Sequence, residues 1–157
     1  MTKSRDMIVL YFFTKICPLH RIFFHDCILW HLQLVLLNVS KNKLTNLPES
    51  IGSCFSLEEL QADNNMISVI PSSICNLVHL KSLCLNNNNV DAVPRNLLKQ
   101  CKLLQNISLR NNPISMEQFQ QIEGFQEFES RRKKKFDKQI DSNVMISSKG
   151  LDEGVDL

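Results

Sequence analysis

The chain has 157 residues, of which 43% are hydrophobic and 22% charged, and its formal net charge is +2. This length fits one domain, since a single core usually serves roughly 100–200 residues, and the composition is that of an ordinary globular protein. So small a net charge excludes a global electrostatic attraction to nucleic acid or membrane, and any such attraction must be local.

Residues 1–33 form a divergent apolar segment. Residues 7–13 (MIVLYFF) follow Lys3 and Arg5, as in the start of a signal peptide, but charged residues interrupt the stretch after them and no small-residue cleavage site follows. The apolar run also falls short of the roughly 20 residues that a membrane helix needs. A signal peptide or membrane anchor is therefore the less favoured interpretation of this segment.

From Leu34 onwards the sequence repeats itself. Four blocks share the pattern L-x-x-L-x-L-x-x-N, and their final asparagines are 23, 23 and 24 residues apart. After each of the first three blocks come an aliphatic–proline pair and a further aliphatic residue. The blocks are LVLLNVSKN (34–42), LEELQADNN (57–65), LKSLCLNNN (80–88) and LQNISLRNN (104–112).

This period predicts an α/β solenoid over residues 34–114, with three complete repeats and a fourth strand. Alternate residues of each short strand, such as Leu37 and Val39, would point inward, and stacked strands would pair as a parallel sheet on the concave face. The prolines at 48, 71 and 94 would start short helical or 3₁₀ turns on the convex side.

The final asparagine of each block is predicted to be structural. It follows the strand where the chain bends, and its amide can both donate to and accept from backbone groups that the bend leaves unpaired. The predicted column consists of Asn42, Asn65, Asn88 and Asn112.

The six cysteines form no C-x-x-C pair and no zinc-ligand spacing. Cys54 and Cys101 stand where the second repeat has Leu77, if one inserted residue is allowed in the third repeat. We expect them to be buried apolar residues in a reducing compartment. A redox pair is the less favoured alternative.

These residues resemble the intracellular 23-residue class of leucine-rich repeats, L-x-x-L-x-L-x-x-N-x-L-x-x-L-P-x-x-I-x-x-L, and the plant intracellular Ras-group-related proteins in particular. The resemblance covers residues 34–114, about half of the chain. It implies a cytoplasmic scaffold that binds protein partners, including small GTPases or other signalling proteins. Three and a half repeats lie near the minimum of about three for stability. Residues 1–33 are therefore interpreted either as a cap on the first strand or, as we favour, as a start that replaces missing upstream repeats.

Residues 115–140 are predicted to be a helical cap that shields the last repeat. Ser115 and Gln118 have the spacing of a capping box, and Gly124 is expected to break or bend the helix. Apolar residues follow at helical three-residue steps. They are Met116, Phe119, Ile122, Phe125 and Phe128.

Five consecutive basic residues follow within the cap, namely Arg131, Arg132, Lys133, Lys134 and Lys135. Such a run can serve nuclear import, or attachment to acidic lipid or nucleic acid. The favoured interpretation is a solvated helix face balanced by nearby glutamates. Residues 141–157 are predicted to be a disordered tail.

The predicted function is a non-catalytic protein-binding module, since no catalytic, metal or cofactor motif occurs and no small-molecule substrate is implied. The concave face is the expected binding site, and electrostatic membrane or nucleic-acid association through residues 131–135 is the alternative. The predicted partner-binding residues are Asn38, Ser40, Lys41, Glu59, Gln61, Asp63, Asn64, Ser82, Asn86, Asn87, Asn106, Ser108 and Arg110.

Overall fold

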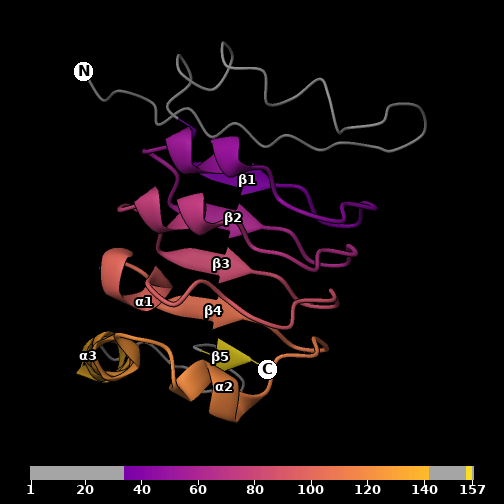
Figure 1. The fold of residues 1–157 in the computed structure, drawn as a ribbon. Helices are drawn as coiled ribbons and strands as arrows, with labels where there is room; N and C mark the ends of the chain where they lie inside the picture. The colour runs from indigo at the N-terminus through magenta and orange to yellow at the C-terminus, as the bar shows by residue number, and fades with distance from the viewer. Residues whose placement is uncertain (1–33, 142–154, 157) are drawn as a thin grey trace, which may run out of the picture.

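The computed structural model describes residues 34–141 and 155–156, with side chains up to Asp137. Residues 1–33, with both interpretations given to them, lie outside the described residues. The described residues form a stack of short parallel strands with helical turns on one side and two helices at the C-terminal end (Figure 1). This is the leucine-rich-repeat solenoid that the 23-residue period predicts.

Each of the four repeats contributes one three-residue strand to a parallel sheet, in the order β1-β2-β3-β4, and the two-residue strand β5 (Val155–Asp156) follows at the edge. The register follows the repeat spacing, so that Leu37 pairs with Leu60, Leu60 with Leu83, and Leu83 with Ile107. The strands of the array are β1 (Leu36–Asn38), β2 (Glu59–Gln61), β3 (Ser82–Cys84) and β4 (Asn106–Ser108).

The central residue of each strand from β1 to β4 is buried and its two neighbours are half-buried, as alternation along a strand requires. The next inward position holds Ala62, Leu85 and Leu109, which are fully buried, and Val39, which is partly buried. One continuous core therefore runs through all four repeats, and each turn buries its aliphatic residues against its neighbours.

The convex side is built from η1 (Glu49–Ser53), η2 (Ser72–Asn76) and α1 (Leu97–Gln100). Pro48 and Pro71 precede the first two turns in extended conformation. The residues that end the three turns are Cys54, Leu77 and Cys101, and all three are buried. This confirms that the two cysteines replace a leucine of the convex core.

The third repeat differs because it is one residue longer. In η1 the backbone bonds span three residues, as from Cys54 N to Ile51 O at 3.0 Å. In α1 they span four, as from Cys101 N to Leu97 O at 3.0 Å. The inserted residue thus turns a 3₁₀ turn into a short α-helix.

The cap consists of α2 (Met116–Gln120) and α3 (Phe125–Asp141). Both bonds of the predicted capping box are present, from Gln118 N to Ser115 Oγ at 3.2 Å and from Ser115 N to Gln118 Oε1 at 2.9 Å. Gly124 separates the two helices with a φ of +88°, which confirms the expected break.

The apolar face predicted for the cap is correct except at its first residue. Phe119 and Phe128 are fully buried and pack edge to face, with ring centroids 6.2 Å apart. Met116 was expected to help shield the core, yet it is 41% exposed. Met116 is the first residue of α2 and directly follows the N-cap Ser115, whereas the buried Phe119 lies one helical turn further along.

Little of the predicted disordered tail lies within the described residues. Asp141 is the last residue of α3, and β5 (Val155–Asp156) pairs in parallel with β4, with Val155 opposite Ile107. At these positions the structure therefore differs from the predicted disorder. None of the helices among the described residues is long and apolar enough to span a membrane.

Candidate interaction surface

The side chains that point outward from the strands form a polar face, which we call the concave face. At the strands themselves, Asn38, Glu59, Gln61, Ser82, Asn106 and Ser108 are all half-buried. The residues just after the strands continue the face, with Ser40, Asp63 and Asn86 half-buried and Lys41, Asn64, Asn87 and Arg110 exposed. The structure thus brings all the predicted partner-binding residues to the outward side of the strands or to the loop that follows.

Many of these side chains also join neighbouring repeats. Asn38 Nδ2 donates to Gln61 Oε1 at 2.8 Å. Further along, Asp63 N donates to Ser40 Oγ at 3.1 Å, Asn86 N to Asp63 Oδ1 at 2.7 Å, and Arg110 N to Asn86 Oδ1 at 2.9 Å. Sequence reasoning missed this role, because it depends on contacts between residues 23 or 24 positions apart.

The residue before each column asparagine has a left-handed backbone. The φ angles are 59° at Lys41, 57° at Asn64, 55° at Asn87 and 57° at Asn111. Asparagine tolerates this conformation better than most residues, whereas lysine has no such advantage. The doubled asparagines in three of the four blocks were the sequence signal for this turn, and sequence reasoning did not use it.

The asparagine column lies inside the bend. Asn88 Nδ2 donates to Leu85 O at 3.0 Å, while Asn88 Oδ1 accepts from Ile67 N at 3.0 Å in the previous repeat. Asn65 and Asn112 accept in the same way from Leu44 N and Val90 N. Asn42 Oδ1 is buried and has no hydrogen-bond partner in the part of the chain that the structure describes.

The charges on the concave face have different surroundings. Burial raises the pKa of the Asp63 carboxyl, partly offset by its hydrogen bonds with Asn86. Burial also raises the pKa of the Cys84 thiol, and the nearby Asp63 and Glu59 add to this effect. At the C-terminal end, Lys135 Nζ donates to Asn106 Oδ1 at 3.1 Å. The face is therefore acidic at the second repeat and cationic towards the cap.

The basic run of the cap, residues 131–135, does not form one exposed surface, because its residues point in different directions from α3. Arg131 donates to two backbone carbonyls, at 3.0 Å to Leu98 O and 3.2 Å to Leu104 O. Arg132 pairs with Glu129 Oε1 at 3.1 Å. Only Lys133 and Lys134 of the five are exposed, because α3 turns the other three towards the array or its own surface.

Within the part of the chain described by the structure, no three His, Cys, Asp or Glu side chains are placed to hold a metal ion. Burial raises the pKa of the thiols of Cys54 and Cys75, and that of Cys101 to about 12. A thiol is a nucleophile only as its thiolate, so these cysteines are poorly suited to reaction at neutral pH.

Comparison with known proteins agrees with this geometry. The Leucine Rich Repeat family model matches residues 33–54 and 56–77. The chain is 76% identical over 63 residues to plant intracellular Ras-group-related LRR protein 7 of Oryza sativa subsp. japonica, a match that covers 40% of this chain and 24% of that protein. It is 40% identical over 60 residues to an LRR-repeat and ubiquitin-like domain-containing protein of Arabidopsis thaliana, covering 38% of this chain and 16% of the relative.

Among solved structures, an LRR protein of Leptospira interrogans superimposes with a TM-score of 0.57 and 35% sequence identity, covering 60% of this chain and 24% of that one. The chain therefore spans about a quarter or less of the length of each of these proteins. Within that span, it carries a leucine-rich-repeat array similar to that of a plant intracellular Ras-group-related LRR protein.

Proposed function

We propose that the chain is a non-catalytic scaffold that binds a protein partner through its concave face. Leucine-rich-repeat proteins are generally interaction modules, and solenoids use extended concave surfaces for binding. The observation that carries the proposal is the set of inter-repeat hydrogen bonds that hold the outward side chains, such as Asn38 to Gln61 and Asp63 to Asn86. Side chains held in this way lose little conformational entropy when a partner binds.

The partner's chemistry follows from the charges of the face. Glu59 and Asp63 lie on the same side of the second repeat, while Arg110 and Lys135 stand towards the cap. A partner with a basic group opposite the second repeat and an acidic group near the cap would match this pattern. The name of the rice relative refers to the Ras group, which supports a signalling protein, such as a small GTPase, as the partner class. The same name calls that relative intracellular, which supports the cytoplasm as the location.

Affinity capture with a charge-altered variant tests the proposal. The variant combines Glu59→Lys, Asp63→Asn and Arg110→Glu, with asparagine at 63 because its Oδ1 can still accept from Asn86 N. The control combines Glu117→Lys, Asp137→Asn and Arg95→Glu at exposed positions away from the concave face, which gives the same change in net charge. Proteins captured from a plant extract by the wild type and the control should be lost by the variant. If all three capture the same proteins, the concave face is not the binding site.

The alternative function is electrostatic attachment through the basic run. It rests on two exposed lysines, Lys133 and Lys134, and not on all five basic residues of the run. Its test is binding of anionic vesicles and of duplex DNA at two salt concentrations, before and after Lys133→Gln and Lys134→Gln. Phosphate binding through these lysines would weaken steeply with salt, and the double substitution would reduce that slope.

A further inference from the structure

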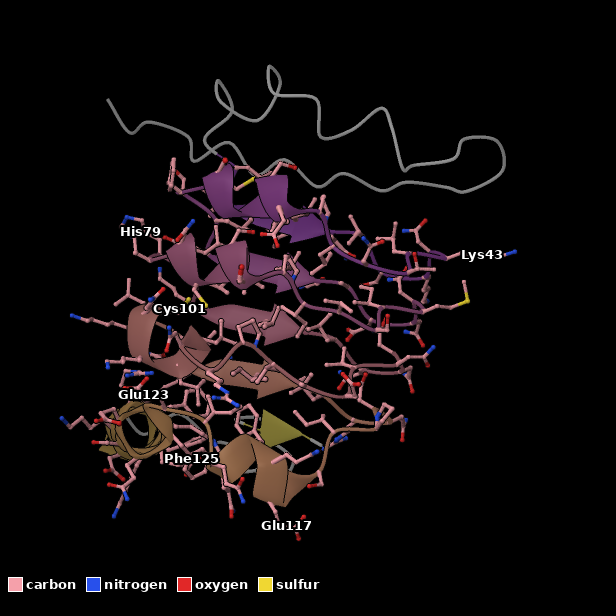
Figure 2. The ribbon with its side chains drawn as sticks, viewed as in Figure 1. Lys43, His79, Cys101, Glu117, Glu123 and Phe125 are labelled. Atoms are coloured by element: carbon pink, nitrogen blue, oxygen red, sulfur yellow. The ribbon has the colours of Figure 1, made fainter. Side chains whose placement is uncertain are left out.

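The convex side carries a groove that the proposed function does not use. Its volume is about 700 Å³, and it runs across the ends of η1, η2 and α1. This side also carries His79 and Cys101, and it lies opposite the loops that contain Lys43 (Figure 2). The groove therefore belongs to a different surface from the loops that follow the strands.

One repeat position supplies the side chains that define the groove. The residue directly after the buried end of each convex turn is Phe55 in the first repeat, Val78 in the second and Lys102 in the third. Phe55 is 55% exposed and Val78 is 50% exposed, although both are large and apolar. The buried Cys75 also lines the groove and adds a further apolar surface.

The third repeat makes one end of the groove cationic. Its longer turn is an α-helix, and Lys99 and Lys102 from this helix and its end line the groove. Lys99 pairs with Glu123 in the loop before α3, whereas no ion pair of Lys102 occurs among the described residues. No carboxylate lines the groove in the described part of the chain. An apolar surface thus leads to a cation that no local acid neutralises.

Three amide side chains complete the lining, from Asn76, Asn96 and Gln100. All three are exposed, and each can donate to and accept from the backbone of a bound chain. Phe55 and Lys102 are two repeats apart, which is at least about 10 Å, because strands are that far apart on the concave side and the convex side of a solenoid is the wider one. An extended peptide covers that distance in about three residues.

We propose that this groove docks an acidic peptide segment of a partner protein, with an apolar side chain against Phe55 and Val78 and a carboxylate about three residues away on Lys102. A single unpaired cation is too little to hold a polyanion such as nucleic acid or an anionic membrane, where several phosphates must be neutralised together. The amides suit a peptide backbone, and the apolar pair suits one anchoring side chain.

The test is selection of binders to the full chain from a displayed library of random peptides, followed by affinity measurements on synthetic copies of the enriched peptides. The enriched peptides should have a common pattern, in which an apolar residue is followed or preceded by Asp or Glu three or four positions away. Phe55→Ser and Lys102→Glu should each weaken binding at least about tenfold, close to 1.4 kcal/mol. Selection on the Lys102→Glu protein should favour Lys or Arg instead of the acidic residue.

Matched controls come from the opposite side of the array. Met66→Ser also replaces a large apolar side chain by serine, and Lys43→Glu makes the same charge reversal. Both positions are exposed, and both variants should leave peptide binding unchanged. The concave-face variant with Glu59→Lys, Asp63→Asn and Arg110→Glu should also leave peptide binding unchanged. Failure of the groove proposal and failure of the proposed function are therefore distinguishable. The proposal is overturned if no peptide is enriched, if enriched peptides lack acidic residues, if their binding survives both groove substitutions, or if anionic vesicles bind through Lys102.

Discussion

Replacing Asn88 by alanine should reveal how much one member of the asparagine column stabilises the array. Asn88 donates to the carbonyls of Ala62, Leu85 and Asn86. Each of these carbonyls has a second donor, from Asn65 Nδ2, Asn112 Nδ2 and Asn64 N respectively. The group left without its bond is therefore the amide N–H of Ile67, which is fully buried.

An unsatisfied buried donor costs about 1–3 kcal/mol, and the lost bonds to shared carbonyls add to this. We expect Asn88→Ala to lower the free energy of unfolding by about 2–4 kcal/mol, a large part of the roughly 5–15 kcal/mol of a typical domain. Asn42→Ala should cost less than about 1 kcal/mol. The reason is that Asn42 Oδ1 is already buried without a partner among the described residues, and Val39 O keeps its bond from Asn65.

Urea unfolding followed by far-ultraviolet circular dichroism measures both changes, and equal slopes against urea show that the unfolding reaction is the same. Asn96→Ala is the matched control, because Asn96 is exposed and its side chain does not cap α1. It should change stability by no more than about 0.5 kcal/mol. If Asn42→Ala costs as much as Asn88→Ala, the stabilising role of the bonds between repeats is refuted.

Three other changes test separate features by the same unfolding measurement. Lys41→Asn should stabilise the protein by about 0.5–1 kcal/mol, since asparagine suits the left-handed backbone at that position, and Asn64→Lys should have the opposite sign; equal signs would contradict the explanation. Gly124→Ala should lower the free energy of unfolding by at least about 1–2 kcal/mol, because φ is +88° and a Cβ atom would lie 2.8 Å from Lys99 N. The control Ser130→Ala, on the exposed part of α3, should have little effect. Asp63→Asn should stabilise at neutral pH. Burial raises the pKa of Asp63 in the folded state, so the stability that this group contributes is present in acid and lost as the pH rises through that pKa. If Asp63→Asn stabilises the protein equally at neutral and at strongly acidic pH, the ionised carboxylate is not the cause.

The architecture could be predicted because it follows from local periodicity. Side chains alternate along a strand, so Leu37, Leu60, Leu83 and Ile107 had to share the inner face, and the spacings of 23, 23 and 24 residues set the strand register. The capping box and the break at Gly124 were predictable for the same reason, since each depends on residues only a few positions apart.

The concave face was predictable as a set of outward positions, but its internal bonds were not. The bond from Asn86 N to Asp63 Oδ1 and the burial of Asp63 arise only when one repeat stacks on the next. Likewise, the five basic residues look alike in the sequence, and the packing of α3 against the array selects Arg131 for backbone carbonyls and leaves Lys133 exposed.

The convex groove is the feature that could least be predicted from the sequence alone. The repeat period places Phe55, Val78 and Lys102 at one repeat position, 23 and 24 residues apart, but it does not predict that the lengthened third turn will place a lysine beside two apolar neighbours. Periodicity assigns each residue to a face because alternation is a property of the backbone. Which side chains meet on that face depends on stacking distances and helix packing, and these exist only once the repeats have assembled.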